Sequence, residues 1–475
     1  MRISTSSWMA LLITSAVIFS AAAAAASAVL HLERMIPLNS SVVAVEHHRA
    51  RDRARHARLF IGLVNFSVYG SADSFYYGIY FTKVKLGTPA KYFNLQIDTG
   101  SDLTWLNSKF CPTCPRSSRF GIELNPYEAA ASSTSKPISC SDKICAAVAP
   151  RNTTRCPRKD QLCSYAMEYM DRATTSGNYV ADMFHFESVR SGSETPNASA
   201  AILFGVSTYR SGVLAETILA VDGIFGFGKG NLSVLSQLYY RGITPRVFSH
   251  CLKGEGTGGG VFVLGEITAP GMVYTPLVPS QPHYSLHLES IAVDGQTVPV
   301  DPLAFTPSAD RATFIDTGTT LSYLVEEAYD PFVHSVNAAV SKFGTPRMKN
   351  GYLCYPISSR LFPPVSLNFA GGASMLLKPE QYLVLYDDGS MWCIGFRKLQ
   401  GLTILGDLVI KDKIFVYDLV RQRVGWVDYD CSSSMNISVS SEDFFNPKQS
   451  SSSSSSRDLL FQLLTIAIVT VILSI

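Results

Sequence analysis

The tripeptide Asp-Thr-Gly occurs twice in this chain, at Asp98–Gly100 and at Asp316–Gly318, 218 residues apart. Each copy follows an apolar run, and each precedes a hydroxyl residue, Ser101 in the first copy and Thr319 in the second. A single copy would be weak evidence, because Asp and Gly are common in the turns that follow strands. Two copies with matched flanks predict one carboxylate from each of two related lobes.

Two aspartates placed face to face would share one proton, because two negative charges so close together cannot both persist. The ionised carboxylate can act as a general base toward water, while the protonated partner polarises a carbonyl group. The duplication therefore indicates a hydrolytic site made by Asp98 and Asp316, with an acidic pH optimum. This chemistry needs no metal and no other cofactor.

The composition is that of a globular protein with many strands. Of 475 residues, 47% are hydrophobic and 16% are charged, and the chain has 33 Gly, 24 Pro, 26 Phe and 22 Tyr. This favours short strands and turns in two domains plus processing segments. The net charge of +2 gives no reason to expect a nucleic-acid partner. The arginine-rich stretch Arg49–Arg58 is better explained as part of a solvated prosegment, at residues 29–70, than as a nucleic-acid arm.

Both ends of the chain resemble targeting segments. Residues 1–28, with an apolar stretch and an alanine run, are typical of a secretory signal peptide. A serine-rich linker at residues 433–458 precedes a hydrophobic tail at residues 459–475. A spanning helix or a core helix would also be apolar, but small residues before a short polar spacer favour a glycosylphosphatidylinositol (GPI) signal. We expect attachment within Ser450–Ser454 and exposure on the outer face of the plasma membrane, with secretion to the extracellular space as the alternative.

The cysteines and glycosylation sequons agree with export. Ten cysteines, an even number, can form five disulfides, and six of them lie between Cys111 and Cys163. The pair Cys111 and Cys114 has the spacing of a metal or redox motif, but the leader argues against free thiols and no second pair with histidines follows. The candidate N-glycosylation sites are Asn65, Asn152, Asn197, Asn231 and Asn436.

Strand patterns begin near Tyr76 and continue to the last cysteine. The region 108–163 has no sustained period and reads as a cysteine-rich insertion in an N-terminal lobe, residues 71–254. A glycine cluster separates this lobe from a C-terminal lobe, residues 255–432. Helices are expected at Val234–Tyr239, capped by Ser233, and at Glu326–Phe343.

The two halves also share a glycine-containing apolar segment after the Asp-Thr-Gly motif. The first half has Gly223–Gly226 and the second has Ile404–Gly406. Taken alone, such triplets are ordinary ends of buried strands. Because one follows each motif, and because glycine permits close backbone approach, we expect each segment to pass beneath its aspartate loop.

From about Tyr76 to Cys431 the sequence resembles the pepsin-like aspartic proteases, and within them the plant nepenthesin-like group with its GPI-anchored members. The strings VFSHCL at 247–252, DGIFGFG at 222–228 and ILGDLVI at 404–410 carry the closer likeness. The resemblance implies an all-β, bilobed fold with a few short helices and an active cleft between the lobes. It further implies a monomeric aspartic-type endopeptidase that hydrolyses polypeptide substrates without a covalent intermediate.

The resemblance also assigns roles to residues. Asp98 and Asp316 correspond to the catalytic pair, and Tyr169 to the tyrosine of a flap that Trp105 anchors. The residues that support the pair are Thr99, Gly100, Ser101, Thr317, Gly318 and Thr319. In this role the two threonines after the aspartates lock the loops together, and Ser101 and Thr319 bond the outer carboxylate oxygens.

The flap departs from the family pattern. Where Tyr-Gly-Asp-Gly-Ser is usual, this chain has Tyr169-Met170-Asp171-Arg172-Ala173. Both glycines are replaced, so a hairpin tip that used positive φ must be rebuilt. Met170 and Arg172 could change specificity, or could stiffen the flap and lower activity.

By the same resemblance the expected disulfides are Cys140–Cys163, Cys145–Cys156, Cys251–Cys431 and Cys354–Cys393. The family usually has cysteines where this chain has Ser108 and Val206, which leaves Cys111 and Cys114 to bond to each other.

A non-enzymatic binding or inhibitor protein of the same fold is the main alternative function. The altered flap favours it, whereas the intact Asp98 and Asp316 favour the enzyme. A membrane-embedded aspartyl protease fits poorly, because neither aspartate lies in an apolar span of about 20 residues.

Overall fold

The computed structural model describes residues 63–73, 78–148, 156, 158–190, 193–217, 220–386 and 389–433. The predicted signal peptide, most of the prosegment, nearly all of the serine-rich linker and the tail lie outside these residues, as do Asn152, Asn436 and Ser450–Ser454. Among the described residues, no helix has the length and apolar character needed to cross a membrane.

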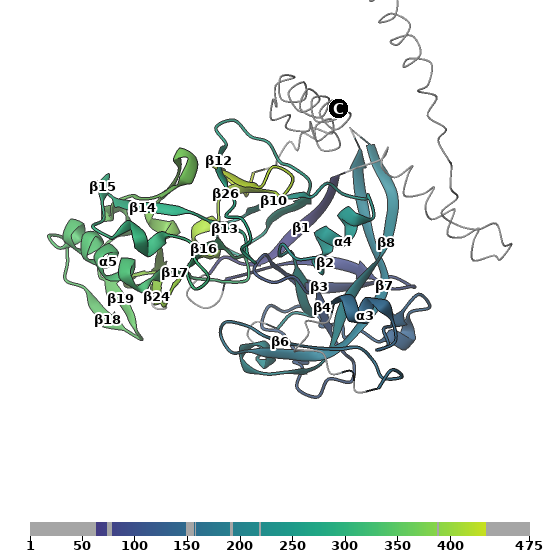
Figure 1. Cartoon of the computed structure of the whole chain (residues 1–475). Coiled ribbons are helices and arrows are strands. Elements are labelled where there is room, and N and C mark those ends of the chain that lie inside the picture. Colours follow the sequence, from purple (N-terminus) through teal and green to yellow (C-terminus); the bar gives the residue numbers. More distant parts are fainter. Residues whose placement is uncertain are drawn as a thin grey trace, which may run out of the picture. The chain divides into compact units, whose positions relative to one another are not determined.

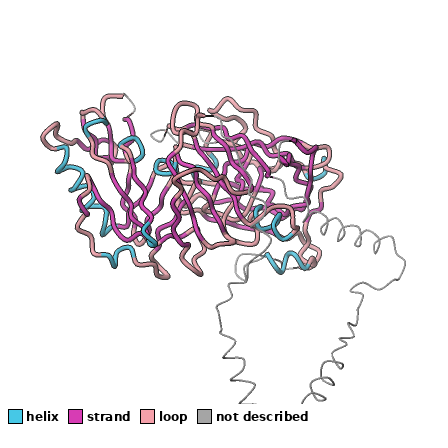
Figure 2. The backbone as a smooth tube through the Cα atoms, turned by 90° about the horizontal axis from the view of Figure 1, so that it is seen from above, coloured by secondary structure: helices cyan, strands magenta, loops and turns pink. Residues whose placement is uncertain are grey.

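Strands dominate the described chain and helices are short (Figure 2). The strands before residue 265 are β1 (Leu63–Ser71), β2 (Ile79–Leu86), β3 (Lys91–Asp98), β4 (Trp105–Asn107), β5 (Lys136–Pro137), β6 (Ser164–Glu168), β7 (Thr174–Arg190), β8 (Ser193–Arg210), β9 (Gly223–Gly226), β10 (Val247–Leu252) and β11 (Gly260–Leu264). The later strands are β12 (Val273–Pro276), β13 (Ser285–Leu286), β14 (Leu288–Val293), β15 (Gln296–Thr297), β16 (Ala312–Ile315), β17 (Ser322–Val325), β18 (Arg347–Lys349), β19 (Tyr352–Tyr355), β20 (Val365–Phe369), β21 (Ala373–Leu377), β22 (Leu383–Leu385), β23 (Trp392–Ile394), β24 (Phe396–Leu399), β25 (Leu402–Leu405), β26 (Lys413–Asp418) and β27 (Arg423–Asp428). The helices are α3 (Lys143–Val148), α4 (Val234–Tyr240), α5 (Glu326–Val340) and α6 (Asp407–Ile410).

The largest sheet draws strands from both halves of the chain. Its order is β12-β27-β26-β10-β11-β1-β2-β3-β9-β4-β8-β7-β5, and β6 pairs with β7. The second half forms three further sheets, β13-β16-β25-β17-β24, β15-β14-β20-β21 and β18-β19-β23-β22. In Figure 1, α5 lies with β14, β17 and β24, while β10, β12 and β26 lie between this group and the strands of the first half. The all-β, bilobed architecture expected from the sequence is therefore present.

Strand β1 extends the folded body into the region predicted to be prosegment. Val64, Phe66 and Val68 are buried while Asn65 between them is exposed, which is the period of two that a strand with one covered face requires. The strand pairs with β2 on one side and β11 on the other. The predicted prosegment boundary at residue 70 therefore falls within a strand of the central sheet.

The expected helices form with small changes of length. Ser233 caps α4, because its side-chain oxygen accepts a hydrogen bond from the amide of Ser236. Helix α5 ends at Val340 rather than at residue 343. Its buried residues are the predicted ones: Ala328, Phe332, Val336 and Val340.

The glycine segments lie beneath the Asp-Thr-Gly loops in both halves. Strand β9 runs parallel to β3 and places Gly226 opposite Asp98, whose carbonyl accepts a hydrogen bond of 2.7 Å from the amide of Phe227. Strand β25 runs parallel to β16, and the carbonyl of Leu405 accepts a hydrogen bond of 3.0 Å from the amide of Asp316. The predicted pairing is confirmed.

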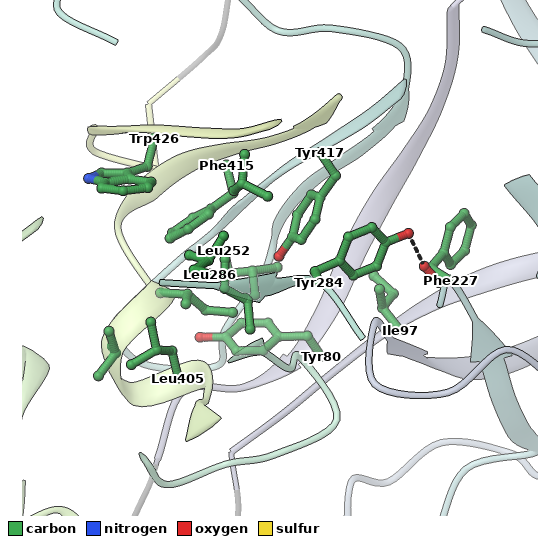
Figure 3. Packing of buried hydrophobic residues seen from close by; sticks show 14 of the residues in the cluster. Tyr80, Ile97, Phe227, Leu252, Tyr284, Leu286, Leu405, Phe415, Tyr417 and Trp426 are labelled. Atoms are coloured by element: carbon green, nitrogen blue, oxygen red, sulfur yellow. Dashed lines mark hydrogen bonds between the residues drawn. The ribbon is translucent and has the colours of Figure 1, made fainter. Parts of the chain in front are cut away.

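Buried aromatic side chains join the two halves behind the loops (Figure 3). The Tyr284 hydroxyl donates a hydrogen bond of 2.7 Å to the carbonyl of Phe227. The Tyr417 ring stacks on Phe248 with centroids 4.3 Å apart and meets Tyr284 edge-on at 4.8 Å. Aromatic pairs of this kind each contribute about 0.5–1.5 kcal/mol beyond the burial of their surface.

Three of the five predicted disulfides are present: Cys111–Cys114, Cys251–Cys431 and Cys354–Cys393. The predicted pairs Cys140–Cys163 and Cys145–Cys156 are wrong for this structure, which joins Cys140 to Cys156 and Cys145 to Cys163.

Burial explains the exchanged partners. Helix α3 turns Cys145 into the cluster of Trp105 and Tyr165, where Cys163 is also buried, whereas Cys140 and Cys156 lie toward the surface. The alternative is close in space, because the sulfur atoms of Cys145 and Cys156 are 3.5 Å apart. Every one of these sulfurs is in a disulfide, so none remains as a thiolate for a metal.

Peptide mapping without reduction should recover the pairs Cys140–Cys156 and Cys145–Cys163. Lys143, Arg151, Arg155 and Arg158 place the four cysteines on separate tryptic peptides, so each linked pair has its own mass. Digestion at mildly acidic pH, which slows thiol exchange, serves as the control. Recovery of Cys140 linked to Cys163 would contradict the assignment.

Candidate active site

Two threonines hold the Asp-Thr-Gly loops of the two halves against each other. The amide of Thr99 donates a hydrogen bond of 3.1 Å to the Thr317 hydroxyl, and the amide of Thr317 donates one of 3.0 Å to the Thr99 hydroxyl. The Thr317 hydroxyl in turn donates to the carbonyl of Ile97 at 2.9 Å, and that of Thr99 to the carbonyl of Ile315 at 3.4 Å. Both threonines are fully buried. This reciprocal set of bonds fixes the spacing of the loops.

The glycine of each loop lies against the aspartate of the other loop. A Cβ atom added to Gly100 would be 2.5 Å from Oδ1 of Asp316, and one added to Gly318 would be 2.7 Å from Oδ1 of Asp98. No side chain fits in either gap. The two carboxylates can therefore come together only because both positions are glycine.

Each carboxylate is held by its own loop in the same way. Oδ1 of Asp98 accepts hydrogen bonds from the amides of Gly100 at 2.8 Å and Ser101 at 3.2 Å, and Oδ2 accepts one from the Ser101 hydroxyl. Oδ1 of Asp316 accepts a bond of 2.8 Å from the amide of Gly318, and its Oδ2 accepts one from the Thr319 hydroxyl. The outer-oxygen contacts expected for Ser101 and Thr319 are present.

Burial and a like charge favour a shared proton. Asp98 is 4% exposed and Asp316 is 9% exposed. Burial, and then the negative charge of Asp316, raise the pKa of Asp98 well above its usual value, although the hydrogen bonds from Ser101 and Gly100 oppose this rise. The pair therefore retains one proton at pH values where an ordinary aspartate is ionised.

A hairpin of β6 and β7 carries the expected flap tyrosine to the pair. The indole Nε1 of Trp105 donates a hydrogen bond of 2.8 Å to the Tyr169 hydroxyl. Burial, and then the charge of Asp98, raise the pKa of Tyr169 far above its usual value, so its hydroxyl stays protonated. Trp105 is fully buried, which makes it a rigid support for the hairpin.

Comparison with known proteins agrees with this geometry. Family profiles described as "Xylanase inhibitor N-terminal" and "Xylanase inhibitor C-terminal" match residues 80–266 and 283–428. Aspartic proteinase 36 of Arabidopsis thaliana is 36% identical over 401 residues, which are 82% of this chain and 81% of the relative. Aspartic proteinase 39 of the same plant is 35% identical over 434 residues, 89% of each chain. The chain belongs to the pepsin-like aspartic proteinase family.

Solved structures similar to this family member include two globulins. Conglutin gamma from lupine matches with a TM-score of 0.60 and 20% identity, over 77% of this chain and 95% of that one. Basic 7S globulin from soybean also matches with a TM-score of 0.60 and 20% identity, over 81% of this chain and 100% of that one. At this identity the likeness shows the fold alone.

A third carboxyl group, which was not predicted from the sequence, lies near the pair in this member of the family. Asp407 begins α6, and its amide donates a hydrogen bond of 2.8 Å to the carbonyl of Thr319. Burial, and then the charge of Asp316, raise the pKa of Asp407 well above its usual value, and its Oδ1 has no hydrogen-bond partner in the described chain. A neutral acid at this point keeps a further negative charge away from the pair. The string ILGDLVI contains this residue, but nothing in its pattern distinguishes a buried acid from an exposed residue at a helix start.

The flap tip keeps its hairpin without glycine. The amide of Tyr169 donates to the carbonyl of Ala173 at 2.8 Å, the amide of Arg172 donates to the carbonyl of Tyr169 at 3.0 Å, and Oδ1 of Asp171 accepts from the amide of Ala173 at 2.9 Å. Arg172 takes the left-handed conformation, with φ of 69°. Its exposed ion pair with Glu168, at 3.0 Å, adds little stability. Arg172 therefore adopts the strained backbone that glycine would adopt freely.

The glycosylation candidates within the described chain lie on strands and at a helix start. Asn65 is exposed on β1, and Asn231 is exposed just before α4, where its Oδ1 accepts a hydrogen bond of 3.2 Å from the Tyr240 hydroxyl. Asn197 lies in β8.

Replacing Thr317 with Val should destabilise the protein by about 2–4 kcal/mol, because it leaves the buried amide of Thr99 and carbonyl of Ile97 without their partner. Thr317→Ser keeps the hydroxyl and loses one methyl group, so its expected cost is about 1 kcal/mol. Urea denaturation of the two variants measures the difference. Equal stability of the two variants would show that the hydroxyl does not hold the loops together.

Replacing Arg172 with Gly should stabilise the folded protein by about 0.5–1 kcal/mol, since relief of left-handed strain exceeds the added entropy of the unfolded chain. Arg172→Ala is the matched control, because it also loses the ion pair with Glu168 but keeps a Cβ atom at positive φ. Its stability should stay within about 0.5 kcal/mol of the parent. A stabilisation by Ala equal to that by Gly would exclude backbone strain as the cause.

Proposed function

We propose that the protein is an aspartic endopeptidase that hydrolyses peptide bonds in polypeptide substrates at acidic pH. The observation that carries the proposal is the reciprocal packing of Asp98 and Asp316, each against the glycine of the other loop. Both carboxylates are buried and hydrogen-bonded through both oxygens, which is the arrangement expected of groups that must keep a defined orientation during a reaction.

The proposed reaction uses one water molecule and the single proton of the pair. The ionised carboxylate removes a proton from water as the oxygen attacks the scissile carbonyl carbon, and the protonated carboxyl donates its proton to the carbonyl oxygen. The resulting gem-diol collapses when the amide nitrogen takes a proton from the pair and leaves as an amine, while one diol hydroxyl gives its proton back to the pair as the carboxyl C=O forms. The pair ends with the one proton that it held at the start. Because water and not a carboxylate attacks the carbonyl carbon, no covalent enzyme intermediate forms.

The flap hairpin would cover the extended substrate. Tyr169, held by Trp105, stays neutral next to the charged pair and can exclude water without adding a charge. Both carboxylates come from one chain, which favours a monomer as the active form.

We extend the proposal to the nepenthesin-like, GPI-anchored group and to the outer face of the plasma membrane, with secretion to the extracellular space as the alternative. The apolar tail after the serine tract and the exposed sequon residues Asn65 and Asn231 support this placement. An arginine-rich prosegment would cover the carboxylates until processing, because opposite charges attract in a partly buried cleft.

A second candidate function is that of a binding or inhibitor protein. The matching profiles are described as xylanase inhibitors, and the flap tip has Met170 and Arg172 in place of glycines. A binder needs the folded cleft but no shared proton, so the two candidates differ in their dependence on Asp98.

Cleavage of a mixed peptide library by the processed protein should be pepstatin-sensitive, should be fastest in acid, and should decline as the pH rises through the raised pKa of Asp98, where the pair loses its proton. Asp98→Asn and Asp316→Asn should each reduce cleavage by about 10³-fold or more. Mass spectrometry of the products, from pH 3 to 7, measures both effects.

The folding of Asp98→Asn is checked by its thermal stability as a function of pH. Because the pKa of Asp98 is higher in the folded than in the unfolded chain, the native protein loses stability as pH rises from about 4 toward the folded-state pKa, by about 1.4 kcal/mol for each pH unit. The Asn variant should thus be more stable than the parent near neutral pH, with the difference vanishing in strong acid. A folded parent protein that cleaves nothing would support the binding function instead.

A further inference from the structure

The second lobe has a counterpart of Trp105. We call the strands and side chains beside each aspartate loop a wall: Trp105 on β4 with β8 in the first lobe, and Tyr323 on β17 with β24 in the second. Trp105 follows Asp98 by seven residues and Tyr323 follows Asp316 by seven. In β4, Trp105 pairs with Gly205 of the parallel strand β8 and with Ile224 of β9. In β17, Tyr323 pairs with Arg397 of the parallel strand β24 and with Ile404 of β25. The ladders are equivalent, so Tyr323 occupies the position of Trp105 and Arg397 that of Gly205.

Side chains alternate between the two faces of β24, so one face packs into the core and the other belongs to the wall. Phe396 is buried and meets Phe332 of α5 edge-on at 5.4 Å, whereas Arg397 is half-buried on the other face of the strand. Tyr323 is likewise half-buried and lies between the buried residues Ser322 and Leu324. The guanidinium carbon of Arg397 is 4.6 Å from the ring centroid of Tyr352 on β19.

The wall lies within electrostatic reach of the flap tip. Burial raises the pKa of Tyr323, the positive charge of Arg397 opposes this rise, and Tyr352 and the flap residue Asp171 add to it. Asp171 belongs to the first lobe and Tyr323 to the second. Substrate held between the flap and the second lobe would therefore pass beside Arg397.

Arg397 forms no ion pair in the part of the chain that the structure describes, whereas its neighbour Lys398 pairs with Asp330 at 2.6 Å. The aromatic groups near Arg397 are Tyr323, Tyr329 and Tyr352. Of the neighbouring charges, that of Asp171 acts on Tyr323, and those of Asp330 and Lys398 act on Tyr329. Contact with the Tyr352 ring holds the planar guanidinium of Arg397 in place. The guanidinium can then donate two parallel hydrogen bonds to a ligand with little further loss of side-chain entropy.

We propose that Arg397 is a specificity-determining residue that selects substrates with an acidic side chain at the subsite formed with Tyr323 and Tyr352. The inference rests on the proposed endopeptidase function. Guanidinium–carboxylate pairing supplies the recognition, and a carboxylate binds such a fork more strongly than an amide of the same shape does. Because Glu and Asp side chains have pKa values near 4, the preference should be present at about pH 5.5 and should disappear at about pH 3.

The test compares peptides that differ only by Glu or Gln at one position, scanned along both sides of the scissile bond. At one position kcat/KM should favour Glu by about tenfold at pH 5.5, and the ratio should fall to about one at pH 3. Arg397→Met should abolish the preference, so that kcat/KM becomes equal for the Glu and Gln peptides at pH 5.5. Lys398→Met, which removes an adjacent but paired cation, should retain the preference.

Binding measured without turnover separates this inference from the proposed function. In the Asp98→Asn background, fluorescence anisotropy of the same labelled peptides should show the Glu preference, and the added substitution Arg397→Met should remove it. Cleavage with no preference at any position, or a preference that survives Arg397→Met, would overturn the assignment of Arg397. Binding that shows the preference, combined with a parent protein that cleaves nothing, would overturn the endopeptidase function while supporting the role of Arg397.

Discussion

The structure depends on a buried pair of carboxylates that repel each other and that water would solvate better than the protein does. The bonds between Thr99 and Thr317 fix the loops, and Gly100 and Gly318 leave room for the opposite acid. Burial costs free energy, and repulsion between the carboxylates adds to that cost. The strands beneath the loops must therefore be rigid. The parallel pairs β3–β9 and β16–β25, backed by the aromatic cluster of Tyr284 and Tyr417, provide that rigidity.

The two lobes contain equivalent strand ladders, β8-β4-β9 and β24-β17-β25, but the side chains beside them differ. In the first lobe, Gly205 lies so close to Tyr165 that an added Cβ would come within 2.5 Å of its ring, and Trp105 turns its indole to the flap. In the second lobe, the equivalent of that glycine is Arg397, and the equivalent of the tryptophan is Tyr323. Symmetric strands thus position the pair, while the side chains beside them make one wall aromatic and covered and the other cationic.

The sequence predicted the parts of the fold and site that depend on short, repeated patterns. The paired Asp-Thr-Gly motifs, the glycine segments under them and the apolar face of α5 follow from local chemistry and spacing. The disulfide between Cys145 and Cys163 could not be predicted in this way, because the choice of partner depends on which sulfur atoms the fold buries. Asp407 was missed for the same reason, since its raised pKa comes from burial and from Asp316, which is distant in sequence.

The two candidate functions differ in whether they require the buried carboxylates, which lower the free energy of unfolding near neutral pH. A binding protein would gain stability from replacing a buried acid with an uncharged residue, because the raised pKa of Asp98 weakens the native state near neutral pH. Only a reaction that uses the shared proton benefits from keeping both carboxylates, their hydrogen bonds and two glycines that admit no side chain. The strain at Arg172 lies in the exposed tip of the flap, away from the bonds of Tyr169 to Trp105. In the proposed enzyme, the altered flap would therefore change how substrate is covered, while the groups that would carry out hydrolysis remain complete.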